Sequence, residues 1–375
     1  MESNANPLQQ HSAEILDAVL RRAHSAGLSR RQLLAALGAL GLGFHASQDA
    51  RAQDNPGELV IANWGGPATA AFIKVWGSTL QQKYGMKIVV DGSGPTAGKI
   101  RTMVESGKVA WDVCDASVGA AVLLGKSNFL EEIDYRAIGT NTVRKEHQYK
   151  WAVCNYIFSY VMAYNTSKLG GRSPTSWKDF WNVKDFPGKR TLRGSCIGQL
   201  ECALLADGVA PDKIYPIDVP RALDKIKQIR EHTIFWKSGS QSEDLFRQNE
   251  VVMGNMWHNR TNLLRQETSG NINWTWNGGV VAPAVWVVPK STPARKQRAM
   301  NFIAVSLEPA SQAELFKLIG MGPSNPAAAA LIPPELKRFD PSQPENLARQ
   351  IVIDEEWYGA NLVEVEAKYL SIISS

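Results

Sequence analysis

The stretch Val89–Ile100, VVDGSGPTAGKI, holds the residue types of a phosphate-binding loop: three glycines and then a lysine. A Walker A loop needs four residues between its first glycine and the Gly-Lys pair, and a Ser or Thr after the lysine. Here five residues separate Gly92 from Gly98, and Ile100 follows Lys99. The three glycines also miss the dinucleotide-binding spacing by one residue. The sequence therefore excludes a nucleotide site of either type.

The same loop joins a predicted strand, 86–90, to a predicted helix, 95–106. Free N–H groups at a helix N-terminus attract polar or anionic groups. We take the hydroxyls of Ser93 and Thr96 as candidate ligand contacts, together with Ser117 after a second predicted strand and Tyr156 on a long apolar run. A purely structural role explains each of them as well.

Motifs for catalysis are missing: the chain has no G-x-S-x-G and no H-E-x-x-H. Asp112 and Asp115 form a plausible carboxylate pair, but aspartate at a strand end commonly forms a turn. The four cysteines fit no zinc spacing, and both disulfides and buried free thiols stay open for them; they are Cys114, Cys154, Cys196 and Cys202. We expect no enzyme activity, no cofactor and no metal.

The N-terminal region predicts export. Ser29–Leu34, SRRQLL, is a twin-arginine sequence, and an apolar run over 33–44 follows it. That run is too short to span a bilayer, and it is followed by an A-x-A cleavage pattern at Ala50–Ala52. We interpret residues 1–52 as a Tat-type signal peptide, which makes the Tat translocon a partner during export and the periplasm the destination. The stretch before Arg30 is long for a signal, so translation could start further in.

Charge and periodicity describe the rest of the chain. The net charge is +5, or +4 without residues 1–52, and no basic block suggests nucleic-acid binding. Short apolar runs alternate with helical patterns, which indicates an α/β fold with largely parallel strands. A long run over 151–164 reads as a strand that crosses between two domains, and 251–257 and 280–288 read as buried strands. Ser176 and Asp179 have the spacing of a helix capping box.

These signals, in their order, resemble a known family. The stretches LVIANW, WDVCDAS, YVMAYNTSKL, SPTSWKDFW, NEVVMGNMWHNRTNLLRQ and IGMGPSNPAAAALI are similar to segments of the spermidine/putrescine-type periplasmic solute-binding proteins of ABC importers. The resemblance implies a type II periplasmic-binding fold, with two α/β lobes around a ligand cleft. It places lobe 1 at 58–160 plus 282–322 and lobe 2 at 163–279 plus 327–375.

The resemblance also indicates which residues face the cleft. Trp64 and Trp257 follow predicted strand ends and match aromatic cleft positions of the polyamine binders, where an indole attracts an alkylammonium. The acids that pair with polyamine ammonium groups are missing at the matching positions Ser195, Gly198 and Ala284. Glu201 lies one turn away.

Basic residues appear near the same segments instead. Arg193, His258 and Arg260 favour a carboxylate or phosphate ligand, unless they are solvated charges or bridges between the lobes. The candidate ligand-binding residues are therefore Trp64, Ser93, Thr96, Ser117, Tyr156, Arg193, Ser195, Trp257, His258 and Arg260.

The family resemblance implies a periplasmic protein that captures a small polar solute, polyamine-like by family, and delivers it to ABC permease subunits in the inner membrane. Two alternatives follow from the residues: a binder of an anionic or neutral solute such as an organic acid or amino-acid derivative, and a Tat-exported enzyme. Delivery to a sensor instead of a permease also stays open.

Overall fold

The computed structural model describes residues 57–139 and 142–374. The predicted signal peptide lies outside the described residues. Residues 54–375 form one compact unit, and the predicted lobe boundaries within it stay a prediction.

The described strands form one sheet in the order β2-β1-β3-β9-β5-β8-β6-β7, with three short strands attached to β5 and β9. Its strands are β1 (Glu58–Ala62), β2 (Lys87–Asp91), β3 (Val113–Ser117), β4 (Gln148–Tyr149), β5 (Ala152–Asn165), β6 (Arg190–Arg193), β7 (Thr233–Trp236), β8 (Met253–Trp257), β9 (Ile272–Val287), β10 (Gly322–Pro323) and β11 (Gln350–Val352). We call the β1, β2 and β3 side the first half and the β6, β7 and β8 side the second half.

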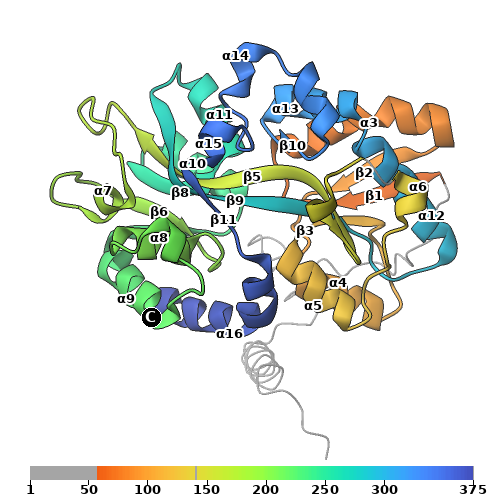
Figure 1. Cartoon of the computed structure of the whole chain (residues 1–375), viewed down its shortest axis with the longest axis horizontal. Helices are drawn as coiled ribbons and strands as arrows, with labels where there is room; N and C mark the ends of the chain where they lie inside the picture. Colours follow the sequence, from red (N-terminus) through yellow and green to blue (C-terminus); the bar gives the residue numbers. More distant parts are fainter. Residues whose placement is uncertain (1–56, 140–141, 375) are drawn as a thin grey trace, which may run out of the picture. The chain divides into compact units, whose positions relative to one another are not determined.

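The long strands β5 and β9 connect the halves (Figure 1). They pair antiparallel along almost their whole length, from Val153 opposite Trp286 to Asn165 opposite Ile272. Both strands are largely buried, as the apolar runs predicted. The predicted crossing strand at 151–164 is confirmed, and β9 is longer than the predicted 280–288.

The first half is a parallel β-α-β arrangement in which β1 pairs with both β2 and β3. Its helices are α3 (Pro67–Tyr84), α4 (Ala97–Glu105), α5 (Val118–Lys126), α6 (Tyr135–Ile138), α12 (Pro293–Ser306) and α13 (Pro309–Ile319). Its core holds an aromatic cluster of Phe72, Trp76, Trp286 and Phe302. The 3-10 turn η1 (Lys145–His147) precedes β4.

The second half has the same parallel arrangement: β6 pairs in parallel with both β7 and β8. Its helices are α7 (Trp177–Trp181), α8 (Gln199–Ala206), α9 (Val219–Ile229), α10 (Gly239–Arg247) and α11 (His258–Glu267), with 3-10 turns η2 (Pro211–Lys213) and η3 (Arg230–His232). The predicted capping box is confirmed: the Asp179 carboxylate accepts a hydrogen bond from the Ser176 N–H at 3.1 Å. Trp177 and Phe180 are buried on the covered face of that helix.

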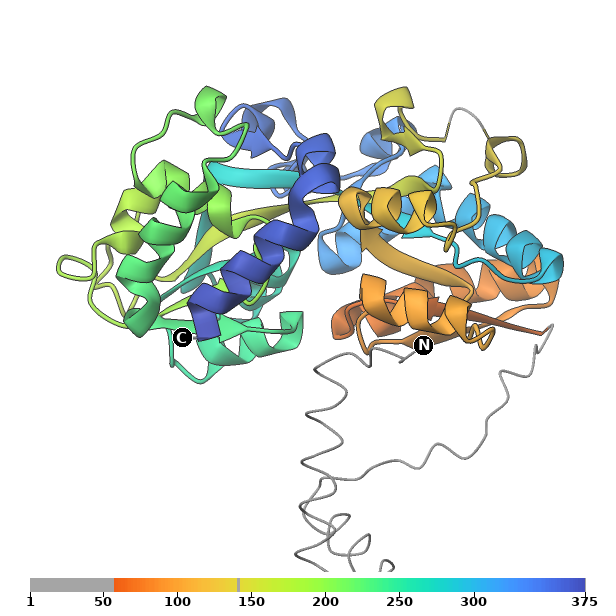
Figure 2. The same cartoon turned by 90° about the horizontal axis from the view of Figure 1, so that it is seen from below.

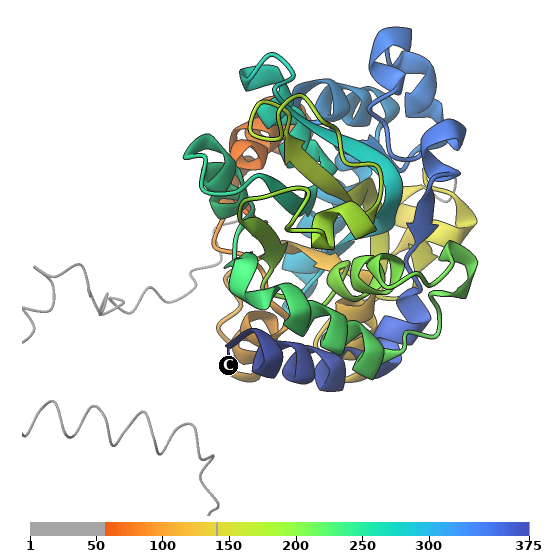
Figure 3. The same cartoon turned by 90° about the vertical axis from the view of Figure 1, so that its left-hand side faces the viewer.

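The C-terminal segment holds η4 (Pro326–Leu331), α14 (Pro334–Lys337), α15 (Pro344–Leu347), β11 and the long helix α16 (Glu355–Ser374). No pattern in the sequence predicted α16. This helix packs on α9 of the second half and on α5 of the first half (Figure 2). In Figure 3 it runs along the lower edge, beside the helices of the second half. The C-terminal segment thus contacts both halves.

All four cysteines are buried free thiols, which answers the question that the sequence left open. Within the described part of the chain, no helix has the length and apolar character that crossing a membrane requires.

Candidate ligand-binding site

A cavity of about 380 Å³ lies at the strand ends, and residues of both halves and of α16 line it. This volume is within the usual range for small-molecule sites. Eight of the ten predicted site residues line the cavity: Trp64, Thr96, Ser117, Tyr156, Arg193, Ser195, Trp257 and Arg260. The two that do not are Ser93 and His258.

Ser93 belongs to the glycine-rich loop and takes part in the loop's own structure. Lys99 folds back and donates from Nζ to the carbonyl oxygens of Ser93 and Gly94, at 2.9 and 3.1 Å. The Thr96 hydroxyl caps α4 by accepting from the Lys99 N–H. The lysine that suggested phosphate binding therefore stabilises its own turn.

His258 is fully buried and bridges two backbone segments. Its Nδ1 accepts from the Ser159 N–H at 3.1 Å, and Nε2 lies 2.8 Å from the Gly320 carbonyl oxygen, to which it donates. Burial lowers the pKa of His258 to about 4, so the ring is neutral at pH 7. We accordingly leave His258 out of the proposed site.

This burial predicts acid sensitivity. In the unfolded chain His258 takes up a proton near pH 6.5, but in the folded chain only near pH 4, so its contribution to stability is lost as pH falls through that window. Protonation of His258 is expected to lower the free energy of unfolding by about 2–3 kcal/mol between pH 7.5 and pH 4.5. Urea unfolding of the wild type and His258→Gln at both pH values measures it. An equal pH dependence in the two proteins would contradict the assignment, and His232→Gln, at an exposed site, is the control.

Arg193, at the end of β6, presents a cation inside the cavity. Its Nη1 donates to the Tyr160 hydroxyl at 2.7 Å, and its guanidinium carbon lies 5.2–5.7 Å from the ring centres of three tryptophans, Trp64, Trp236 and Trp257. Over residues 57–139 and 142–374, Arg193 forms no ion pair. A guanidinium held among indoles, with N–H groups to spare, is suited to bind a carboxylate in a forked geometry.

Asp115 presents a carboxyl group from the first half. It is buried and accepts a hydrogen bond from the Tyr156 hydroxyl at 2.8 Å. Burial raises the pKa of Asp115 to about 7, although the hydrogen bond from Tyr156 lowers this pKa. A buried carboxylate is stabilised by an opposite charge, so Asp115 is suited to pair with a ligand ammonium.

Aromatic side chains form the cavity wall between these charges. Trp64 and Trp257 face each other from the two halves with ring centres 6.5 Å apart. Tyr156, Phe158 and Tyr160 alternate along β5 and all line the cavity, as the two-residue period of a strand requires. Such a wall binds alkyl chains and attracts ammonium groups.

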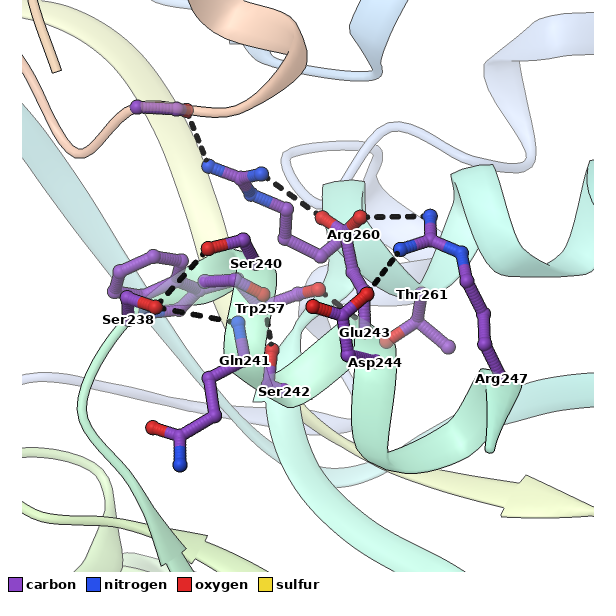
Figure 4. A network of polar contacts seen from close by, with 12 residues as sticks. Ser238, Ser240, Gln241, Ser242, Glu243, Asp244, Arg247, Trp257, Arg260 and Thr261 are labelled. Atoms are coloured by element: carbon purple, nitrogen blue, oxygen red, sulfur yellow. Dashed lines mark hydrogen bonds and ion pairs between the residues drawn. The ribbon is translucent and has the colours of Figure 1, made fainter. Parts of the chain in front are cut away.

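Arg260, on α11, is already paired within the protein. Figure 4 shows its guanidinium bonded to Glu243 on one side and to a backbone carbonyl on the other, with Arg247 on the far side of Glu243. The carbonyl belongs to Gly65, in the first half, and accepts at 2.7 Å. The sequence left open that Arg260 is a bridge between the halves, and its contact with Gly65 is such a bridge.

Several lining residues were missed from the sequence. Asp115 was taken as a turn former, yet it lies two residues before Ser117 on the same strand and so shares its face. Asn63 also lines the cavity, and its Nδ2 finds no hydrogen-bond partner among the described residues. Glu355 and Glu366 lie on α16, for which no local signal was recognised.

The carboxylates of Glu355 and Glu366 both accept hydrogen bonds from backbone N–H groups. Glu355 accepts from the Gly119 N–H at 3.1 Å, and burial raises its pKa to about 8. Glu366 accepts from the Cys196 N–H at 2.7 Å and from the Ser195 hydroxyl. Glu201, the acid that the sequence noted near Ser195, does not line the cavity; it accepts from the hydroxyls of Tyr215 and Tyr358.

Two α/β halves joined by long strands, with charged and aromatic side chains around a cavity at their strand ends, define a solute-binding protein of the periplasmic-binding-protein fold. Residues 76–341 match the family described as bacterial extracellular solute-binding protein. The chain belongs to this family.

Several similar proteins are named for small organic solutes or were solved with one bound. The gamma-aminobutyric acid-binding protein of Pseudomonas aeruginosa is 31% identical over 339 residues, which cover 89% of this chain and 94% of that protein. The structure of the Atu4243 GABA receptor has a TM-score of 0.76 at 30% identity and covers 84% of this chain and 97% of its own. AgtB from A. tumefaciens R10, solved with agropinic acid, has a TM-score of 0.79 at 30% identity, covering 85% and 99%.

These comparisons favour the organic-acid or amino-acid-derivative alternative over the polyamine hypothesis. A putative spermidine/putrescine transporter from Listeria monocytogenes is similar at 16% identity with a TM-score of 0.67, and this likeness shows the fold alone. The family and its relatives are substrate-binding proteins of ABC transport systems, not enzymes.

Proposed function

We propose that the protein binds a small ω-amino acid of the 4-aminobutanoate type. One observation carries the proposal: Arg193 from the second half, without an ion-pair partner among the described residues, and the buried Asp115 from the first half line the same cavity. Arg193 would bind the ligand carboxylate and Asp115 its ammonium, and the indoles of Trp64 and Trp257 would enclose the alkyl chain.

The same charges argue against a polyamine. A diamine has no group for Arg193, and its second ammonium would lie near a guanidinium in a site with little water, where like charges repel strongly. The relatives named above support an amino-acid-like ligand, because two of them are named for gamma-aminobutyric acid and the third was solved with agropinic acid.

A titration-calorimetry series separates these possibilities. We expect 4-aminobutanoate to bind at least about 100-fold more tightly than either butanoate, which lacks the ammonium, or putrescine, which lacks the carboxylate. Tighter binding of putrescine would overturn the proposal. NMR of the recovered ligand tests the enzyme alternative, which predicts a new product where we expect unchanged solute.

We also infer the cellular setting. The twin-arginine sequence Ser29–Leu34 supports export through the Tat translocon to the periplasm, and the family supports delivery of the solute to ABC permease subunits in the inner membrane. The halves would act as lobes that close around the ligand, since each supplies one of its two charged contacts.

A further inference from the structure

Arg260 joins the two halves without using a side chain of the first half. It is the third residue of α11, and its Nη2 donates to the backbone carbonyl of Gly65 at 2.7 Å. Gly66 leaves the room for this approach: a Cβ there would lie 2.1 Å from Nη1 of Arg260. A backbone carbonyl accepts a hydrogen bond whatever the ligand is, so this contact depends on how the halves are placed and not on ligand charge.

Glu243 holds Arg260 in position and neutralises it. Glu243 lies on α10, and its Oε1 is 2.8 Å from Nη1 of Arg260. The side chains are 3% and 5% exposed, respectively. The other carboxylate oxygen, Oε2, accepts from Arg247 at 2.8 Å, and Arg247 in turn pairs with the more exposed Glu267. Figure 4 shows Glu243 between the two arginines.

Two arginines thus line the cavity, and only one of them is paired with a carboxylate among the described residues. Arg193 makes no ion pair among the described residues, whereas Arg260 has a buried carboxylate beside it. A buried cation without a partner would itself attract an anion. Without Glu243, both Arg193 and Arg260 could bind a ligand carboxylate, and the cavity would accept two carboxylates instead of one.

We propose that Glu243 is a specificity-determining residue and Arg260 a positioning residue: the neutral Glu243–Arg260 pair holds the halves together at Gly65 and keeps the cavity selective for ligands with a single carboxylate. The selectivity arm rests on the proposed function, because it assumes that Arg193 binds a ligand carboxylate. The positioning arm concerns the closed protein, in which Arg260 reaches Gly65, and does not depend on the charge of the ligand.

The positioning arm is tested by the distance between spin labels on the two halves in protein saturated with 4-aminobutanoate, because the halves close around the ligand. Gln82→Cys on α3 and Gln228→Cys on α9 place labels at exposed positions, and the native cysteines are buried. We expect Arg260→Met to shift the distance distribution toward longer distances. Glu267→Gln, which removes the outer partner of Arg247 but leaves Arg260 untouched, is expected to keep the original distribution. An unchanged distribution in Arg260→Met would overturn the positioning role.

The selectivity arm compares 4-aminobutanoate with L-glutamate, which carries one additional carboxylate. We expect Glu243→Gln to lower the ratio of dissociation constants, glutamate over 4-aminobutanoate, at least tenfold, and Glu267→Gln to leave it unchanged. Adding Arg260→Met to Glu243→Gln should restore the original ratio, because the exposed cation is then gone. An unchanged ratio in Glu243→Gln, in protein whose circular dichroism matches the wild type, would overturn the selectivity role.

Failure of the proposed function has a different signature. If the wild type binds neither probe, the ligand class is wrong, whereas binding of 4-aminobutanoate with unchanged label distances in Arg260→Met counts against the positioning role alone. If Glu243→Gln does not fold, Arg260→Lys serves in its place: it keeps the pair with Glu243 but cannot span to Gly65 with a second N–H group. We then expect the longer label distances with an unchanged selectivity ratio, and unchanged distances would count against the proposal.

Discussion

Replacing Arg193 by alanine is expected to raise the dissociation constant for 4-aminobutanoate at least about 100-fold. The guanidinium makes no ion pair in the described part of the chain and is surrounded by three indoles, so a carboxylate bound to it is shielded from water. Truncating one partner of such a buried charge pair costs about 2–5 kcal/mol. Arg193→Lys keeps the charge but loses the fork, and we expect an intermediate loss of about tenfold. Titration calorimetry measures both variants.

The control for this prediction is Arg221→Ala, which removes an arginine that pairs with Asp207 on the surface and does not line the cavity. Its affinity should equal that of the wild type. If Arg193→Ala bound 4-aminobutanoate as the wild type does, the carboxylate would have to bind elsewhere, and the proposed orientation of the ligand would be wrong.

Asp115→Asn is expected to abolish the pH dependence of binding as well as most of the affinity. In the free protein burial raises the pKa of Asp115 to about 7. A ligand ammonium pairs with the ionised form, so below pH 7 binding must release a proton from Asp115. The wild-type affinity should therefore fall as pH decreases, by about 100-fold from pH 8 to pH 5, while both ligand charges persist over that range.

Calorimetry at pH 5, 6, 7 and 8 measures this effect, and buffers of different ionisation enthalpy count the released proton directly. Asp115→Asn should bind weakly and equally at all four pH values, whereas Asp207→Asn, outside the cavity, should keep the wild-type profile. A steep pH dependence that survived in Asp115→Asn would assign the proton to another group, with Glu355 the first alternative because its pKa is raised to about 8.

The role of Arg260 cannot be inferred from residue types alone, because it depends on the partners of its guanidinium. An arginine beside a cleft tryptophan suggests a site for a carboxylate or phosphate, or else a bridge between the lobes. In the structure its guanidinium is paired with Glu243, which lies 17 positions earlier, and with the backbone of Gly65. We now expect Arg260 to act on all ligands through the position of the halves.

Features that depend on local chemistry could be predicted from the amino-acid sequence. Apolar runs placed β5, β8 and the C-terminal part of β9, because a strand buried on both faces needs apolar residues throughout. The Ser176–Asp179 spacing placed a helix start, since capping acts over three residues. Strand ends located Trp64 and Trp257, because ligands bind beyond the carboxyl ends of strands in such folds.

Which charged side chains can bind a ligand depends on how the chain is packed. Asp115 and Arg193 come from different halves of the sheet, and their common cavity arises from the pairing of β5 with β9 and from α16, which covers its side. Whether an arginine is neutralised depends on a carboxylate brought close by folding, as Arg193 and Arg260 show. The desolvation that raises the pKa of Asp115 likewise comes from side chains distant in the sequence. Burial and charge pairing are properties of the packed chain, and no local pattern of residues encodes them.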